Sequence, residues 1–531
     1  MSKNLKNISL VSALTLVSRV LGLARDSLIA AVFGTSALAS AFTTAFTLPN
    51  LFRRLLGEGA LTAAFVPTLH DELNQWQREG AFRLVSQVST WLLVITAGIV
   101  SLSIAVLIAA AQLAQHGHTG GASPETAKRW IQAAELAVWL FPYLIFVCLA
   151  AAFSAALQTL QRFLEPALSP IWLNLAIIAL LSSAVAWQWG DGDLGKMHWL
   201  CVGVLFGGVL QMIVPAVTLM RLGWRPRFDL QLSPQVRAIA RLMAPTLFGS
   251  AIYLVNMSVS RFIGLSLDDA SATVLNLASR LMELPIGLFA VAVTTVIFPL
   301  ISRYAAQGDW TNMATAYRKG MRLILVMNIP AAAGLALLAT PIVRLLFERG
   351  EFSASDTALT MPVVAVYALG LPFFSFVSLM LRAFYAQKDT LTPVHAALFS
   401  FIINIVLSLL LMRKLGTVGL ALAGNLAVVA QAVYLQRRLS RRRQELRFAP
   451  LVPDLAKILA ATALMSAAVY GAEHLSNRFM HARVLDDVLR IAGVIAAGVV
   501  VYGTTLWALK IEGSADLVRL LRRRRDDRPA R

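Results

Sequence analysis

Apolar segments long enough to cross a bilayer recur along the whole chain, and this repetition limits the fold more than any other feature. A helix needs about 20 apolar residues to cross the hydrocarbon core. Such runs lie near residues 7–34, 37–69, 84–113, 129–158, 165–187, 197–221, 236–265, 270–303, 320–347, 357–386, 391–412, 417–436, 454–473 and 486–509. Only 14% of the 531 residues are charged, against about 25% in soluble domains. We therefore predict an all-α polytopic membrane protein with about 14 transmembrane helices.

Basic residues gather in the connections on one side of the predicted bundle, most densely at 221–241, at 436–457 and in the tail beyond residue 521. An even number of helices puts both termini on that side, and the positive-inside rule makes it the cytoplasm. The net charge of +19 then attracts anionic membrane lipids. We predict no nucleic-acid binding.

The two halves of the chain carry a similar proline pattern, which predicts an internal repeat. A Leu-Pro pair at Pro49 and another at Pro285 each precede a small-residue apolar run that ends at a second proline. Two six-helix lobes with parallel topology would follow. The predicted parts are an N-terminal lobe (1–222, helices 1–6), a cytoplasmic linker (223–235), a C-terminal lobe (236–440, helices 7–12), helices 13–14 (441–512) and a basic cytoplasmic tail (513–531).

Charged residues also stand inside the apolar helices, where each costs about 2.5–3.5 kcal/mol on insertion scales. Six arginines face three carboxylates: Arg19, Arg25, Arg53, Arg54, Arg261 and Arg280 against Asp26, Glu58 and Glu283. Guanidinium groups suit phosphate oxygens, so we predict an anion site that a pyrophosphate would fill. In the alternative interpretation, Arg25–Asp26 and Arg280–Glu283 are structural pairs, and Arg53, Arg54 and Glu58 snorkel to the interface.

Two other function classes fit the sequence less well. A multidrug or cation antiporter should carry unpaired carboxylates in its cavity, and here arginines dominate. An enzyme for lipid-linked sugars would need paired acids or a metal site on a sizeable loop, but the connections are short and the histidines lack metal-ligand spacing. Cys148 and Cys201 lie in apolar runs and form neither a disulfide framework nor a metal site. We expect no catalytic residues, no metal and no cofactor.

Five stretches of the chain resemble the MurJ (MviN) family, the lipid II flippases of bacterial peptidoglycan synthesis. That family belongs to the multidrug/oligosaccharidyl-lipid/polysaccharide exporter superfamily. The stretches are SRVLGLARDSLIAAVFG (18–34), AFTTAFTLPNLFRRLLGEGALTAAFVPTL (41–69), SRLMELPIGLFAVAVTTVIFPLIS (279–302), RGEFSASDT (349–357) and AFYAQKDTLTPV (383–394). The resemblance covers most of the chain and is weakest in helices 3–6 and beyond about residue 440.

The resemblance implies a flippase of the bacterial inner membrane, working in cell-wall biogenesis and cell shape. It would move lipid II, an undecaprenyl-pyrophosphate-linked disaccharide pentapeptide, from the cytoplasmic to the periplasmic leaflet by alternating access. The essential cavity arginines of the family fall on Arg19, Arg25, Arg53 and Arg280, and Asp26, Asn50 and Glu58 match the same hairpin motif. Helices 13–14 would line a groove for the lipid tail. A flippase for another undecaprenyl-linked oligosaccharide stays open as the alternative.

The chain departs from the family pattern at three acidic positions. Ser40, Ser260 and Ser279 stand where relatives often carry an acid. The predicted cavity is therefore more positive, and a sodium site or a gate salt bridge at these positions would lack its acids.

Overall fold

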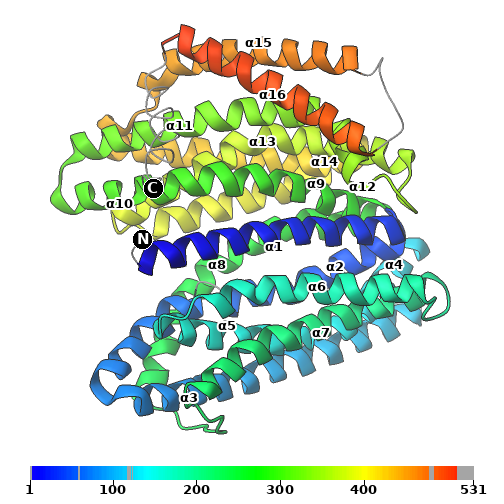
Figure 1. The fold of residues 1–531 in the computed structure, drawn as a ribbon, viewed down its shortest axis with the longest axis vertical. Helices are drawn as coiled ribbons and strands as arrows, with labels where there is room; N and C mark the ends of the chain where they lie inside the picture. Colours follow the sequence, from blue (N-terminus) through cyan, green and yellow to red (C-terminus); the bar gives the residue numbers. More distant parts are fainter. Residues whose placement is uncertain (1–2, 58–59, 117–120, 122, 477–483, 511–531) are drawn as a thin grey trace, which may run out of the picture. The chain divides into compact units, whose positions relative to one another are not determined.

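The computed structural model describes residues 3–57, 60–116, 121, 123–476 and 484–510, and they are almost entirely helical (Figure 1). Within this part of the chain there is no strand. The predicted all-α class is confirmed. Glu58 and the basic tail at 513–531 lie outside the described residues.

The chain divides into two compact units, Met1–Thr273 with Arg349–Ser353, and Val274–Glu348 with Ala354–Arg531. In the first unit, α1 packs on α6, α6 on α7, α2 on α4, and α3 on both α5 and α8. The elements up to α8 are α1 (Lys3–Phe33), α2 (Ala37–Phe52), η1 (Arg53–Gly57), α3 (Ala60–Gln115), α4 (Pro124–Leu140), α5 (Tyr143–Thr159), α6 (Leu164–Ala186), α7 (Gly192–Arg221) and α8 (Pro234–Leu267).

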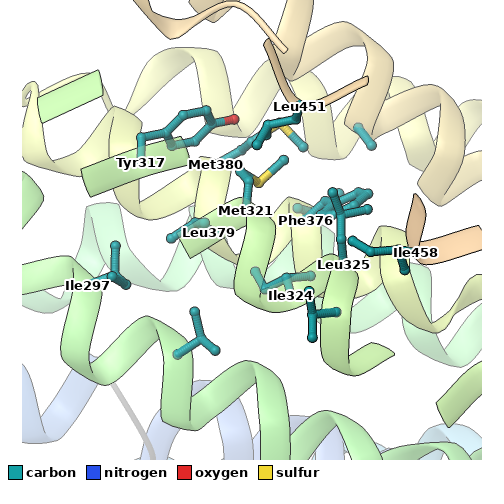
Figure 2. Close-up of a cluster of buried hydrophobic side chains, with 14 of the residues drawn as sticks. Ile297, Tyr317, Met321, Ile324, Leu325, Phe376, Leu379, Met380, Leu451 and Ile458 are labelled. Atoms are coloured by element: carbon teal, nitrogen blue, oxygen red, sulfur yellow. The ribbon is translucent and has the colours of Figure 1, made fainter. Parts of the chain in front are cut away.

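In the second unit, α13 packs on α11 and α14, and α15 packs on α11 and α16. A core of buried side chains holds α10, α11, α13 and α15 together, with Tyr317, Ile324 and Leu379 near its centre (Figure 2). The elements are α9 (Ser271–Pro285), η2 (Ile286–Ala290), α10 (Val291–Gln307), α11 (Trp310–Leu337), α12 (Ala339–Phe347), α13 (Ala354–Ala386), α14 (Leu391–Arg442), η3 (Gln444–Leu446), η4 (Ala449–Leu451), α15 (Val452–Ser476) and α16 (Val484–Ala508).

Eight of the described helical segments are long and apolar enough to cross a membrane, or nine if the bent pair α4–α5 is one span. Helices α3 and α14 are each broken by one non-helical residue, Gln77 and Gly416. A multi-pass membrane protein is therefore confirmed, and the number of 14 spans stays a prediction.

The two predicted proline breaks coincide with π-helical segments. Pro49 lies four residues before η1, and Pro285 directly precedes η2. The order α-helix, π-segment, α-helix occurs in both halves, with α2 starting 16 residues before η1 and α9 starting 15 residues before η2. A π-turn inserts extra backbone into a helix and is often found at functional sites.

The RGEF motif forms a tight turn between α12 and α13 that touches the end of α1. The Glu351 amide donates to the carbonyl oxygen of Ala31 at 2.8 Å. Gly34 and Gly350 both have positive φ, +56° and +60°, and a Cβ on Gly34 would lie 2.7 Å from the Glu351 carbonyl oxygen. The close backbone approach therefore requires glycine at both positions.

Candidate functional site

Arg25 and Asp26 form a buried cluster on α1, where this helix packs against α6. The Arg25 Nε and Nη2 atoms donate to Asp26 Oδ1 at 3.0 and 2.7 Å. Arg25 Nη1 donates to Oδ1 of Asn174 on α6 at 3.0 Å. Arg25 is 8% and Asp26 6% exposed. The guanidinium is therefore held in a fixed plane by a carboxylate and an amide.

Asn174 was not a predicted site residue, although its sequence position carries a signal. Its Nδ2 donates to the backbone carbonyl oxygen of Ser18 at 3.2 Å, so one amide joins Arg25 to the backbone of α1. An amide side chain within a membrane-spanning helix is costly unless it faces other polar groups. The lone asparagine in the apolar α6 sequence could therefore have indicated a polar contact with another helix.

Arg53 opens the π-segment η1 and is oriented from the preceding turn. Its Nε donates to Oδ1 of Asn50 at 3.2 Å, and its backbone amide caps α2 by donating to the Asn50 and Pro49 carbonyls. Proline at position 49 removes one backbone donor within α2. Arg53 is half-buried, whereas Arg54 next to it is exposed.

The remaining predicted site residues in the described part of the chain are Arg280 and Arg19. Arg280 on α9 donates from Nη1 to Glu283 Oε2 at 3.1 Å, and its side chain is 36% exposed. Arg19 is exposed on α1, six residues before the Arg25 cluster. The structure thus joins Arg25 with Asp26, and Asn50 with Arg53, inside the first unit, and it places Arg280 in the second unit. Their role in binding a substrate stays a prediction.

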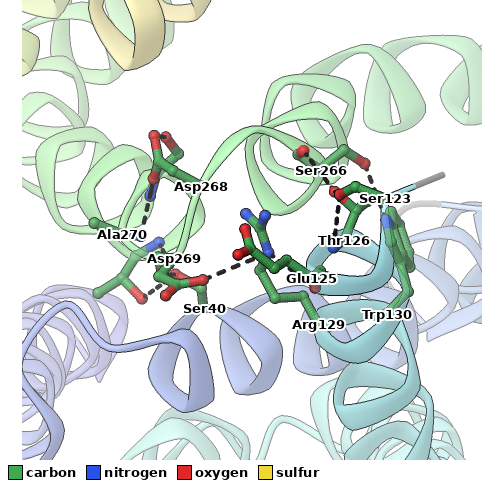
Figure 3. A network of polar contacts seen from close by, with 12 residues as sticks. Ser40, Ser123, Glu125, Thr126, Arg129, Trp130, Ser266, Asp268, Asp269 and Ala270 are labelled. Atoms are coloured by element: carbon green, nitrogen blue, oxygen red, sulfur yellow. Dashed lines mark hydrogen bonds and ion pairs between the residues drawn. The ribbon is translucent and has the colours of Figure 1, made fainter.

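Ser40, one of the three serines singled out in the sequence, lies in a polar network at the start of α2 (Figure 3). Its hydroxyl donates to the Asp269 carbonyl oxygen at 2.6 Å and accepts from the Thr273 amide at 3.3 Å. Asp269 also pairs through its carboxylate with Nε of Arg129 on α4, at 3.4 Å. The serine therefore ties α2 to the connection between α8 and α9 without a charge of its own.

This geometry offers guanidinium groups in a helical, apolar scaffold. Arg25 pairs with the acid one residue later and Arg280 with the acid three residues later. These are the two pairs that the structural interpretation of the sequence named. Arg53, the first residue of η1, is oriented by the side-chain amide of Asn50. Such groups can bind phosphate oxygens.

Comparison with known proteins places the chain in a sequence family. The family model described as "Lipid II flippase MurJ" matches residues 29–486. A "Probable lipid II flippase MurJ" from Rhizobium meliloti (strain 1021) is 33% identical over 504 residues, covering 94% of this chain and 92% of the relative. Another from Vibrio cholerae serotype O1 (strain ATCC 39315 / El Tor Inaba N16961) is 32% identical over 522 residues, covering 96% of each chain.

Solved structures show the same architecture. The structure titled "Lipid II flippase MurJ, inward closed conformation" superposes with a TM-score of 0.76 at 27% identity, covering 94% of this chain and all of the other. An inward-facing multidrug resistance MATE family transporter of the MOP superfamily gives a TM-score of 0.63 at 17% identity, covering 82% of this chain and 99% of the other. The second likeness concerns the fold alone.

Proposed function

Because this chain belongs to the lipid II flippase MurJ family, we propose that it carries lipid II across the bacterial inner membrane, from the cytoplasmic to the periplasmic leaflet. The observation that carries the proposal is the family match over nearly the whole chain. The protein is a multi-pass membrane transporter of this family rather than an enzyme. Peptidoglycan synthesis would be the process that it serves.

The pyrophosphate of lipid II would be held by the arginines on α1, η1 and α9. Arg25 and Arg280 each pair with a nearby acid on their own helix. In the proposed clamp, a phosphate oxygen would take the place of the carboxylate at each of these two arginines. Arg53 would also contact the pyrophosphate, and Asn50 would orient its guanidinium. Arg19, Asp26 and Glu58 complete the proposed substrate-binding set, by their match to the family motif.

Transport would proceed by alternating access between two lobes, with the predicted boundaries at 222 and 236. The matched order of α-helix, π-segment and α-helix in the two halves supports this internal repeat. Pro49 and Pro285 lie beside the π-segments, where a helix bends most easily. We place both termini in the cytoplasm because the arginine-rich connections would all lie there.

The polyprenyl tail of lipid II would stay in hydrocarbon beside α15 and α16. These helices pack on one another and expose apolar side chains over most of their length. The exposed set includes Leu459, Leu464, Val499, Val500 and Trp507, at 51 to 79%. A long apolar tail needs only such a surface, since it makes no polar contacts.

The test is lipid II exposure on the outer leaflet of cells depleted of their own flippase. The wild-type chain should restore exposure, and Arg25→Ala and Arg280→Ala should lower it to the depleted level at matched membrane abundance. Arg303→Ala removes an exposed arginine at the end of α10 and serves as the control that keeps activity.

A well-inserted wild type that fails to restore exposure would point to another undecaprenyl-linked oligosaccharide as the cargo. Full activity of both arginine variants would mean that these pairs are structural and that the proposed clamp is wrong.

A further inference from the structure

The connection between α7 and α8 is fastened to α3 along its length. The Asp229 amide donates to Thr90 Oγ1 at 3.1 Å, and the Asp229 carboxylate accepts from Gln87 Nε2 at 3.0 Å. Ser233 Oγ donates to Gln87 Oε1 at 2.8 Å. At the other end, the buried Trp224 indole donates to Ser86 Oγ at 3.0 Å. The connection therefore follows one defined path over α3.

Three apolar side chains between these anchoring residues are exposed. Phe228, Leu230 and Leu232 are 69, 46 and 45% exposed. Asp229 is bonded to α3 through both its amide and its carboxylate, while the side chains of its neighbours Phe228 and Leu230 are exposed. We call Phe228, Leu230 and Leu232 the apolar face.

The surroundings of the apolar face are strongly positive. Arginines flank it at positions 221, 225, 227, 237 and 241, and all five are exposed. Asp229 is the one acid between positions 221 and 241, and its carboxylate is bonded to Gln87. Five exposed arginines thus lie on either side of the apolar face in the sequence. Of the α3 carboxylates in the described part of the chain, the one that bonds to this stretch is Glu72, which accepts from Gln235.

The depth in the membrane of this patch of arginines and apolar side chains follows from α7, which precedes it directly. This apolar helix has membrane-spanning length and ends at Arg221. The connection starts directly after it, so the patch lies where lipid headgroups meet the acyl chains. Apolar side chains with arginines beside them are the usual composition of segments that bind a membrane surface. Three side chains are too few for a stable protein interface, which buries about 800 Å² on each partner.

We propose that the apolar face inserts at the acyl boundary while the flanking arginines bind phosphates of anionic phospholipids. The occupant is thus the lipid surface itself, at a site distinct from the proposed lipid II clamp. Under the predicted topology it belongs to the cytoplasmic leaflet. The proposal is independent of what the protein transports.

The experiment uses the full chain with Leu230→Cys, labelled with an environment-sensitive fluorophore. The native Cys148 and Cys201 are buried, so the label goes to the new thiol. The protein is reconstituted in phosphatidylcholine vesicles that contain a minor share of phosphatidylglycerol. Spin-labelled phosphatidylglycerol should quench about five-fold more strongly than the same share of spin-labelled phosphatidylcholine, since one interfacial arginine contributes about that factor.

Two variants control this measurement. Leu102→Cys labels an exposed position within the apolar span of α3, where both spin-labelled lipids should quench equally. In the Leu230→Cys background, Arg225→Gln with Arg227→Gln should lower the preference for phosphatidylglycerol toward that of the control. The backbone carbonyl of residue 227, which accepts from Thr90, is kept in this variant.

Equal quenching by the two lipids with all arginines present would overturn the proposal. So would a label at position 230 that aqueous iodide reaches and neither lipid quenches, which would indicate water or a soluble partner on this face. Lipid II transport by the same labelled protein is measured in parallel. Intact transport without lipid preference would refute this inference alone and leave the proposed function standing.

Discussion

At the scale of single residues, Asn174 joins the arginine cluster of α1 to the neighbouring helix. Both polar atoms of its side chain are used, one by Arg25 and one by the backbone of Ser18. The side chain is 5% exposed. A buried guanidinium that loses an acceptor costs about 1–3 kcal/mol, so the amide stabilises one orientation of Arg25.

We expect Asn174→Ala to lower both stability and transport. The unfolding free energy should fall by about 1–3 kcal/mol because Arg25 Nη1 loses its acceptor, and lipid II exposure in depleted cells should fall because the guanidinium is no longer oriented. Thermal unfolding in detergent and the exposure assay measure the two effects.

The matched control is Asn328→Ala. Asn328 is fully buried, and the one side-chain bond it makes to the described residues runs from Nδ2 to the Ile324 carbonyl of its own helix. It should lose stability and keep transport at equal abundance. If Asn174→Ala also kept full transport, its amide would have a structural role alone.

The sequence predicted the arginines and, in the structural alternative, the acids beside two of them, but not their amide partners. A charge inside an apolar run stands out by composition, which is why Arg25 and Asp26 could be selected. The bond from Arg25 to Asn174 joins positions 149 residues apart, and no local pattern reports which helices pack together. Arg53 and Asn50 are three residues apart, a separation at which side chains on a helix can meet, so this contact lies within reach of a local pattern.

At the scale of elements, the proline pattern predicted where two helices are interrupted but not that the interruptions are π-helical. Pro49 and Pro285 indicated a break in each helix, and a break is found at both places. The π-geometry itself has no sequence signature, because it is an insertion into a helix whose residues are ordinary helix formers. A π-segment changes the register of the helix that follows it relative to the helix that precedes it.

Removal of Leu55 from η1 should restore α-helical register and abolish transport. One residue corresponds to a rotation of about 100° and a rise of about 1.5 Å, so the helix after η1 would be turned relative to Arg53. We expect normal membrane abundance with lipid II exposure at the level of depleted cells. Leu55→Ala, which keeps the register, should remain active. Transport by the shortened chain would show that the π-segment is dispensable.

The helix pair beyond the predicted lobes is attached by an ion pair. Arg322 Nε on α11 donates to Asp454 Oδ2 on α15 at 2.7 Å, with side chains 22 and 14% exposed. Removing one partner of a partly buried ion pair costs an amount of folding free energy between the costs for exposed and for fully buried pairs. Loss of this contact would therefore weaken the attachment of α15 to α11.

Arg322→Glu should lower the unfolding free energy by about 2 kcal/mol, because two carboxylates would then face each other. Asp454→Arg should do the same with two guanidinium groups. The double variant Arg322→Glu, Asp454→Arg recreates an opposite pair and should recover most of the loss. Thermal unfolding of the four proteins gives the coupling; a double variant no more stable than the singles would mean that the pair contributes little.

At the scale of the whole molecule, the class of protein could be predicted more reliably than its number of spans. Hydrophobic composition and segment length determine that the chain is an all-α membrane protein, because backbone polar groups in lipid must be bonded within helices or closed barrels. The length and composition of an apolar segment do not determine how many times a kinked helix crosses the membrane. The breaks at Gln77 and Gly416 divide α3 and α14, and such breaks depend on local backbone geometry rather than on apolar content.

The charge balance of the whole membrane region leads to the last prediction. Six arginines against three carboxylates leave three positive charges inside the apolar helices. A membrane potential that is negative inside acts on each charge that crosses the full field with about 2.3 kcal/mol per 100 mV. It should favour return of the empty, positive site toward the cytoplasm, and so increase the rate of repeated transport.

In proteoliposomes, lipid II transport should therefore be faster under an imposed inside-negative potential than with the potential collapsed by an ionophore. Arg54→Gln removes one of the three excess charges at an exposed position outside the proposed clamp. This variant should match the wild type at zero potential and show a smaller stimulation, because less charge moves in the field. Equal rates with and without potential in the wild type would show that the positive site does not move through the field, and the proposed coupling would then be wrong.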